Sequence, residues 1–238
     1  MPWVVETVVD ASRPDGAEGP IVLGTQTLMK PGRRGVQRPI SPASSAAPGA
    51  FLRTLTSALR AHDEETGEHG ERIRTLAARA AAELELEDVP RLCHAAALHD
   101  VGKLYVPRSI LRKPGKLSET EWRVVSRHPV VGADLLQGIA GFGPVRAAIL
   151  AHHERFDGRG YPLGLAGADI PIEARLICAV DAYDAMTSER PYRSALSHAE
   201  AIERLNLGAR TQFDPAVIEA VERALAKEPR PKRTHALV

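Results

Sequence analysis

The sequence predicts an all-α protein, a bundle of helices preceded by a largely irregular N-terminal segment. Three observations carry this prediction. Apolar side chains recur at helical spacing in several segments. Two Ser-x-x-Glu motifs, which begin at Ser118 and Ser197, are typical of the capping box that opens a helix. No convincing alternation of apolar and polar residues, as a half-buried strand would show, appears after residue 50.

The helices can be followed in order. An apolar stripe continues from His69 through Ile73 and Leu76, which predicts one long helix. Proline is favoured in the first turn of a helix, so Pro144 marks the start of another. The most apolar helix follows a loop rich in Gly and Pro at about residues 154–171. These last two helices are expected over residues 145–154 and 173–188. Two earlier helices are expected over residues 51–63 and 89–98.

The ends of the chain differ from its centre. Residues 1–48 contain closely spaced Pro, Gly, Ser and Arg, so we expect a flexible or remnant segment there. The folded domain is expected over residues 49–228, and residues 229–238 as a solvated tail. With 238 residues, of which 44% are apolar, the chain is long enough to bury a sizeable core.

Charge and cysteine content narrow the class of protein. The net charge is only +1, which argues against a nucleic acid or a membrane surface as partner. No stretch approaches the roughly 20 apolar residues of a membrane-spanning helix. The two cysteines, Cys93 and Cys178, lie in apolar helical contexts and are expected to be reduced core thiols. These features, and the lack of a basic secretory start, predict a cytoplasmic protein.

Histidines and acids within apolar helices are the unusual feature of the sequence. Five of the nine histidines lie beside apolar stripes or carboxylates. Asp181 is embedded in LICAVDAYDAM, where an unpaired carboxylate would cost several kcal/mol, roughly 2–7 on transfer scales for polar groups and more for a charge. Such groups are tolerated together when a cation neutralises them. Any one of them has a structural explanation, so the prediction of a metal site depends on the set.

Two adjacent pairs sharpen this prediction. Neighbouring helical residues diverge by about 100°, so we expect His152 and His153 to reach two ions side by side rather than one. Asp100, beside His99, is placed to bridge such ions through its two oxygens. Mixed imidazole and carboxylate ligands suit Fe or Mn better than Mg or Ca. Two ions about 3.5–4 Å apart are the usual device for attack on a phosphodiester.

From roughly residue 63 to residue 215 the sequence resembles the HD-GYP phosphodiesterases, a branch of the HD hydrolase superfamily. The most specific segment is HHERFDGRGYPLGL, and the others are DEETGEH, ALHDVGK, ILRKPGKLSETEW, SRHPVVGADLL, ARLICAVDAYDAMTSERPYR and FDP. The resemblance implies an HD-domain helical bundle. It also implies a phosphodiesterase that converts cyclic di-GMP to pGpG, and possibly to GMP, by a metal-bridging hydroxide.

The resemblance also implies roles for individual residues. The positions that match metal ligands are Glu65, His69, His99, Asp100, His128, His152, His153 and Asp181. Members with a glutamate at the position of Glu65 hold three divalent ions and the others two, which favours three here; a solvated carboxylate at a helix start is the alternative. Lys103 matches a lysine that stabilises the charge of the phosphate. Tyr161 matches the tyrosine of the GYP turn, where it contacts a guanine or shapes the loop.

Other implied roles leave alternatives open. Arg190 and Arg193 match basic residues that bind the phosphates of the messenger, although ordinary surface ion pairs would also suit them. Asp184 either orients a ligand histidine through its second nitrogen or pairs with Arg190. Gly158 and Gly160 are expected to supply positive backbone angles in the loop.

The resemblance leaves three questions about function. The substrate could instead be cyclic GMP-AMP. The chain could instead be a non-catalytic sensor of cyclic dinucleotides, or an interaction module for GGDEF-domain proteins. Residues 1–48 are too short and too rich in Pro and Gly for a complete receiver domain, so control by a separate regulatory protein is a further possibility.

Overall fold

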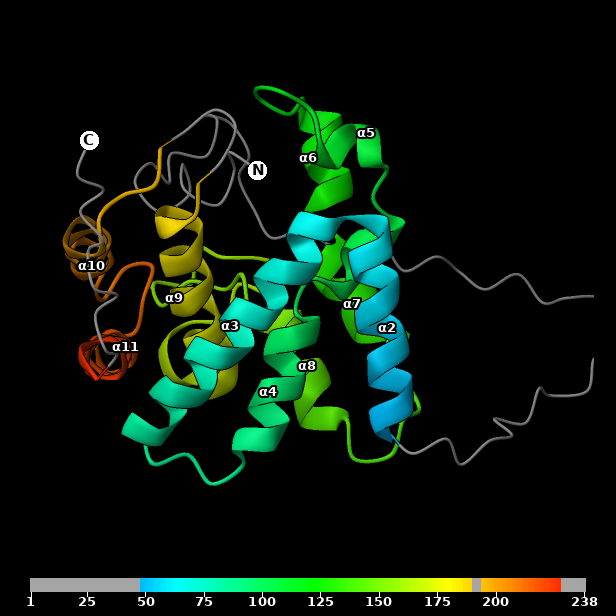
Figure 1. The fold of residues 1–238 in the computed structure, drawn as a ribbon. Helices are drawn as coiled ribbons and strands as arrows, with labels where there is room; N and C mark the ends of the chain where they lie inside the picture. Colours follow the sequence, from blue (N-terminus) through cyan, green and yellow to red (C-terminus); the bar gives the residue numbers. More distant parts are fainter. Residues whose placement is uncertain (1–47, 190–193, 228–238) are drawn as a thin grey trace, which may run out of the picture.

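The computed structural model describes residues 48–189 and 194–227. Within these residues the regular elements are all helices, joined by loops, and a single isolated β-bridge links Ala209 and Phe213, which confirms the all-α class (Figure 1). The elements are α2 (Pro48–His62), α3 (Glu64–Glu83), α4 (Val89–Leu98), η1 (Val101–Tyr105), α5 (Arg108–Leu111), α6 (Glu119–Val125), α7 (His128–Leu135), α8 (Gly143–Ala151), η2 (Gly167–Asp169), α9 (Ile172–Thr187), α10 (His198–Leu207) and α11 (Pro215–Ala226).

The predicted terminal segments fall almost entirely outside this part of the chain. Of residues 1–48 only Pro48 is described, as the first residue of α2, and residues 229–238 are not described. The domain limits at 49 and 228 therefore stay predictions.

Local sequence explains where most of the helices begin. Both predicted capping boxes are confirmed: the Ser118 hydroxyl accepts from the backbone N–H of Glu121 at the start of α6, and Ser197 does the same for Glu200 at the start of α10. Each cap of this kind contributes about 1 kcal/mol. Asp63 caps α3 by accepting from the backbone N–H and the hydroxyl of Thr66.

The predicted end of α8 is wrong. We expected this helix to run through residue 154, but it ends at Ala151, with His152 as its C-cap. His153 and Glu154 already belong to the turn that follows. This turn is closed by the N–H of Glu154, which donates to the carbonyl of Ala151 at 2.9 Å. Because the helix ends early, the side chains of His153 and Glu154 do not follow the spacing of α8.

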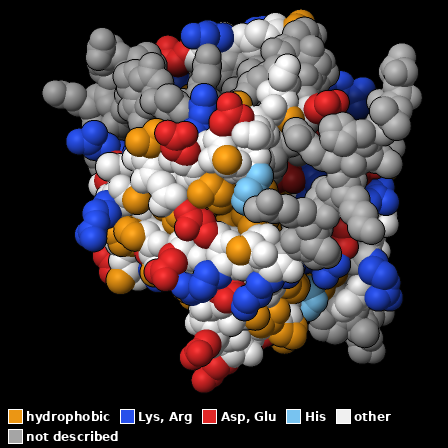
Figure 2. All heavy atoms as spheres, turned by 60° about the vertical axis from the view of Figure 1, so that its left-hand side comes forward, with side chains coloured by type: hydrophobic (Ala, Val, Ile, Leu, Met, Phe, Trp, Pro, Cys, Tyr) orange, Lys and Arg blue, Asp and Glu red, His pale blue; other side chains and the backbone are white. Residues whose placement is uncertain are grey.

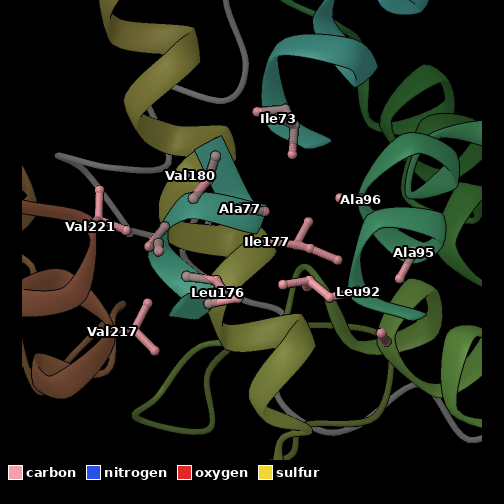
Figure 3. Packing of buried hydrophobic residues seen from close by; sticks show 14 of the residues in the cluster. Ile73, Ala77, Leu92, Ala95, Ala96, Leu176, Ile177, Val180, Val217 and Val221 are labelled. Carbon is pink, nitrogen blue, oxygen red and sulfur yellow. The ribbon is translucent and has the colours of Figure 1, made fainter. Parts of the chain in front are cut away.

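Helix α3 lies at the centre of the bundle, packed against α2, α4, α9 and α11 (Figure 1). Figure 3 shows the contact from close by. Ile73 and Ala77 of α3, Leu92 of α4 and Ile177 of α9 belong to one core, and Val221 of α11 lies on the far side of it. All five side chains are fully buried. Since α3, α4 and α9 share this core, the polar groups at their ends are held in fixed relative positions.

The surface is mixed in character. On the face shown in Figure 2, basic and acidic side chains lie interspersed with apolar ones, in keeping with the net charge of +1. Cys93 and Cys178 are both free, as expected, but each is only partly buried and not fully within the core as predicted. Over the described residues, none of the helices combines the length and the apolar character that a membrane crossing needs.

Candidate metal centre

Seven of the eight side chains predicted to be metal ligands converge in the interior of the bundle. They form three groups, within each of which the potential ligand atoms lie within 4.8 Å of one another. His99 and His152 each belong to two groups, so the three groups make one continuous cluster. The groups are His69, His99 and Asp181; His99, Asp100 and His152; and His128, His152 and His153.

Helices α3 and α9 supply one side of the cluster. His69 Nε2 lies 2.9 Å from Asp181 Oδ1, while its Nδ1 lies 2.7 Å from Asp184 Oδ2. Asp181 and Asp184 are three residues apart on α9, so both face α3. Arg72 then holds Asp184 from the other side: its Nε donates to Oδ1 at 2.7 Å and its Nη2 to Oδ2 at 2.9 Å. Of the two roles considered for Asp184, the contact with a predicted ligand histidine is therefore present.

The C-terminal end of α4 supplies the middle of the cluster. His99 follows the last residue of α4, and Asp100 comes next, before η1. Lys103, one turn further, places its Nζ 2.6 Å from Asp100 Oδ2. All three side chains are buried, so the ammonium and the carboxylate interact strongly.

Gly102 is what allows this segment to reach the far side of the cluster. A Cβ at Gly102 would lie 2.0 Å from the carbonyl oxygen of His128 and 2.7 Å from the backbone nitrogen of Gly132. Only glycine fits such a contact between backbones. The result is that η1 and α7 meet directly, and His128 Nε2 comes within 3.2 Å of Asp100 Oδ1.

Helices α7 and α8 supply the third side. His128 opens α7 and His152 caps α8, and their Nε2 atoms lie only 3.2 Å apart. The ring of His153 is 4.1 Å from that of His152 and 5.0 Å from that of His128, between centroids. The helical geometry assumed for His152 and His153 is therefore wrong, because α8 ends before them and their rings do not diverge as on a helix. Whether the two bind one ion or two ions stays a prediction.

Backbone carbonyls fix the tautomer of three of these histidines. Nδ1 of His99, His128 and His152 lies 2.7, 2.8 and 2.6 Å from the carbonyl oxygen three residues earlier. A carbonyl oxygen only accepts, so Nδ1 carries the proton and the Nε2 lone pair points into the cluster. Asp184 performs the same function for His69.

These geometries fit divalent metal ions. His99 Nε2 and Asp100 Oδ1 are buried and make no hydrogen bond. The facing Nε2 atoms of His128 and His152 would repel each other without a proton or a cation between them. Imidazole nitrogens and carboxylate oxygens are ordinary ligands of first-row transition metals. The cluster therefore has the donor set and the unmet bonding capacity that such ions need.

The ionisation of the cluster agrees with this fit. Burial lowers the pKa of His152 and His153 well below the ordinary value, and the neighbouring histidines lower it further, so both are neutral near pH 7. Burial alone would raise the pKa of Asp100, but Lys103 and the nearby histidines lower it well below its usual range. Burial would lower the pKa of His69, yet its bonds to Asp181 and Asp184 raise it to about 9. Without metal His69 is thus protonated on both ring nitrogens near pH 7, and an incoming ion would displace the proton on Nε2.

The loop that follows α8 forms one wall of the site. Tyr161 stacks on His153 with ring centroids 4.9 Å apart, and Trp122 of α6 meets Tyr161 edge-on at 5.7 Å. The buried Glu154 holds the loop, because its Oε1 accepts from the backbone N–H of Leu163 at 2.6 Å and of Gly164 at 3.1 Å. Burial raises the pKa of this carboxyl, while the two N–H donors lower it in part.

The two glycines of the loop have different functions. Gly158 has a positive φ of 78°, as expected. The expectation is wrong for Gly160, which has no positive φ. A Cβ there would lie 2.3 Å from the backbone nitrogen of Arg155 and 2.4 Å from the Cα of Glu154. This glycine therefore allows the loop to fold back on itself, not to adopt a left-handed conformation.

One predicted site residue lies away from the cluster, and two others are not described by the structure. Glu65 is exposed at the start of α3 and belongs to none of the three groups, so its role at a third ion stays a prediction. Arg190 and Arg193 lie outside the described residues, and their contacts with a substrate stay predictions too.

Sequence reasoning gave no role to three residues at the site. Arg72 lies one turn after His69, a spacing that would have indicated a shared helix face. Glu154 directly follows the two histidines in the quoted motif, but only its burial reveals that it anchors the loop. Trp122 carried no signal, since its contact with Tyr161 joins segments distant in sequence.

The fold and the site together define an all-helical domain with a buried cluster of histidines and aspartates able to hold metal ions. The family model described as "HD domain" matches residues 53–217, which include every residue of the cluster. The chain therefore belongs to the HD domain family.

Similar curated proteins indicate which branch of the HD domain family the chain belongs to. "Cyclic di-GMP phosphodiesterase response regulator RpfG" of Xanthomonas campestris is 42% identical over 180 residues, covering 74% of this chain and 48% of that protein. "3'3'-cGAMP-specific phosphodiesterase 3" of Vibrio cholerae is 36% identical over 194 residues, covering 78% and 42%. These relatives, with the motifs quoted above, confirm the predicted place in the HD-GYP branch. The chain spans about half the length of the curated relatives that it matches.

A solved structure supports the fold. The crystal structure of a cyclic GMP-AMP specific phosphodiesterase of V. cholerae matches with a TM-score of 0.58 at 21% identity, covering 76% of this chain and 49% of that one. At this identity the match supports the helical arrangement alone.

Proposed function

We propose that the chain hydrolyses a cyclic dinucleotide, cyclic di-GMP first of all, at a centre of divalent metal ions. The observation that carries this proposal is the set of Nε2 lone pairs and carboxylate oxygens that meet within 4.8 Å of one another in each group. The names of the relatives support the substrate class, since they describe phosphodiesterases for cyclic di-GMP or for cyclic GMP-AMP.

Bound metal ions would supply a water molecule of lowered pKa and positive charge beside the phosphate. The residues of the chain prepare the centre for them. His99, His128 and His152 hold their lone pairs inward through their backbone bonds. The carboxylate of Asp100 lies between His128 and Lys103. The buried ammonium of Lys103 adds positive charge where the phosphate gains negative charge during attack.

The walls of the site exclude water and orient the substrate. Tyr161 is held between Trp122 and His153 at the edge of the cluster. Aromatic faces of this kind bind nucleobases by stacking, at about 1–3 kcal/mol per base. We propose that Tyr161 contacts a guanine, and that Arg190 and Arg193 bind the phosphates.

Fe or Mn are the ions that we propose, two in the buried cluster and a third if Glu65 turns inward. The donor set supports this choice, because imidazole and carboxylate together favour first-row transition metals over Mg or Ca. Metal content of anaerobically purified protein, measured with and without Glu65→Ala, tests the number. The same number of ions in both proteins would exclude Glu65 as a ligand.

The central test is turnover measured together with metal content on the same preparation. Wild-type protein should convert cyclic di-GMP to pGpG, and Asp100→Ala should abolish turnover while the fold survives. Asp214→Asn is the matched control, since Asp214 is another buried aspartate in an ion pair, with Arg175, but lies outside the cluster. Turnover by Asp100→Ala at the wild-type rate would contradict the proposed site. A metal-free, inactive wild-type protein would instead support a sensor or an interaction module for GGDEF-domain proteins.

Cyclic GMP-AMP is the second candidate substrate, because relatives named for it are nearly as similar to the chain as those named for cyclic di-GMP. The values of kcat/KM for the two messengers, measured side by side, decide between them. A higher value for cyclic GMP-AMP would replace cyclic di-GMP in the proposal and leave the chemistry unchanged. Since both messengers are bacterial second messengers inside the cell, we propose the cytoplasm as the location.

A further inference from the structure

A pocket lined by arginines lies at the C-terminal end of α2, and no candidate metal ligand lines it. Its volume is about 380 Å³, within the usual range for small-molecule sites. The lining consists of three arginines and two small residues: Ser57, Arg60, Ala61, Arg108 and Arg112. The arginines come from the end of α2 and from the short helix α5 with the residue after it, so the pocket is formed only when these elements pack.

Two of the arginines are held in place by the end of α2. Arg108 donates through Nη2 to the carbonyl oxygen of Ala61. Arg112 donates through Nε and Nη2 to Asp63 Oδ1 at 3.4 and 3.3 Å. A guanidinium has five N–H donors in a fixed fork, so both groups retain donors for a ligand. Both side chains are exposed to solvent, and these bonds restrain them in part, which reduces the entropy lost on binding.

Arg60 is held by packing and not by charge. A Cβ at Gly67 would lie 2.7 Å from the Cβ of Arg60, so this glycine lets α3 press directly on the stem of the arginine. In the described part of the chain, the Arg60 guanidinium makes no hydrogen bond or ion pair. Its charge lowers the pKa of Glu71, which it does not contact through a hydrogen bond or an ion pair.

The charge of the pocket is strongly positive. Three arginines line it, and among the described side chains Asp63 is the one carboxylate in an ion pair with any of them. Arginine forks match the oxygens of phosphate in bidentate contacts, and several such contacts together favour a dianion over a chloride or a carboxylate. The Ser57 hydroxyl adds a further donor.

We propose that Arg60, Arg108 and Arg112 form a binding site for a phosphate group, separate from the metal centre. The ligand class is a phosphate dianion, either inorganic phosphate or the terminal phosphomonoester of a nucleotide. This inference does not depend on the proposed function, since it rests on residues that the metal centre does not use.

Binding of inorganic phosphate to the full, metal-loaded chain tests the proposal by titration calorimetry. The metal centre is expected to bind phosphate as well, so Asp100→Asn serves to remove that contribution. In this background, Arg60→Gln should weaken the remaining binding about tenfold, the effect of losing one charge-assisted contact. Arg223→Gln is the matched control, because it removes an exposed, ion-paired arginine from α11. It should bind phosphate as the background protein does.

Further titrations distinguish free phosphate from the phosphate of a nucleotide, and a further variant controls for misfolding. Tighter binding of GMP than of inorganic phosphate, with no binding of guanosine, would identify a nucleotide phosphate; equal binding would identify free phosphate. Arg60→Lys keeps the charge and the fold, and should bind between wild type and Arg60→Gln. Identical isotherms for the background protein and for a folded Arg60→Gln variant would overturn the proposal, as would phosphate binding that Asp100→Asn alone abolishes.

Discussion

Removal of the Asp184 carboxylate should loosen metal binding although Asp184 is not a ligand. Asp184 Oδ2 accepts from both His69 Nδ1 and Arg72 Nη2, and Oδ1 accepts from Arg72 Nε. The pKa of Asp184 lies well below its ordinary value: burial would raise it, but His69 and Arg72 lower it further. The group is therefore an anion throughout the neutral range, and it keeps the proton of His69 on Nδ1.

The geometry sets the size of the effect. In Asp184→Asn the carbonyl oxygen can occupy the Oδ2 position and still accept from His69, with the amide nitrogen turned toward Arg72 Nε. The amide nitrogen and Arg72 Nε are both donors, so the charge and the bond from Arg72 Nε are lost while the bond from His69 remains. We therefore expect about a tenfold weaker affinity for Mn²⁺, or about 1.4 kcal/mol. Asp184→Ala removes the acceptor as well, and we expect about a hundredfold, or about 2.7 kcal/mol.

The measurement is Mn²⁺ affinity by competition with a chelator, on protein shown to be folded by circular dichroism. Glu173→Gln is the matched control on the same helix, because Glu173 also pairs with an arginine, Arg91, at 2.7 Å but contacts no histidine. The reasoning is refuted if Asp184→Ala binds Mn²⁺ as tightly as the Glu173→Gln protein does.

Three further predictions concern the backbone, the loop and the centre as a whole. Gly102→Ala should destabilise the fold by about 3 kcal/mol or more in denaturant unfolding, because the new Cβ would meet the carbonyl of His128; Gly143→Ala, where no atom lies within 4 Å, should be nearly neutral, and equal stability of the two variants would contradict the contact. Glu154→Ala should speed hydrogen exchange at the amides of Leu163 and Gly164 by roughly tenfold or more, since each loses a bond to a carboxylate of about 1.5–3 kcal/mol; unchanged exchange would mean that the loop is held by other contacts. Addition of Mn²⁺ to chelator-treated protein should raise the free energy of unfolding by about 2.7 kcal/mol at a hundred times Kd, seen as a higher Tm. His152→Ala should lose most of this rise, and a full rise in that variant would place the metal elsewhere.

The local features of the fold were predictable because their causes are local. The capping boxes at Ser118 and Ser197 depend on residues three apart, and the apolar stripe from His69 depends on helical spacing. The end of α8 was missed because it depends on a turn at Glu154, where nothing in the apolar pattern changes. That same turn made His152 and His153 near neighbours in space, contrary to the helical geometry assumed for them.

The sequence predicted the candidate metal ligands of the site, but not most of the residues that hold them in place. The histidines and aspartates stand out because imidazole and carboxylate groups are costly to bury in apolar helices. Arg72 and Asp184 are 112 residues apart in sequence, and the contact of Gly102 with α7 depends on how η1 packs. Such pairings follow from tertiary packing, which leaves no periodic mark on the sequence.

The carbonyl contacts of His99, His128 and His152 make most of the centre insensitive to side-chain substitution around it. A mutation changes a side chain but keeps the carbonyl oxygen, so these three rings retain their orientation whatever their neighbours become. His69 differs, because its second nitrogen depends on the side chain of another helix. Variation among related chains can therefore tune the centre chiefly through this one histidine, while the rest of the ligand set stays constant.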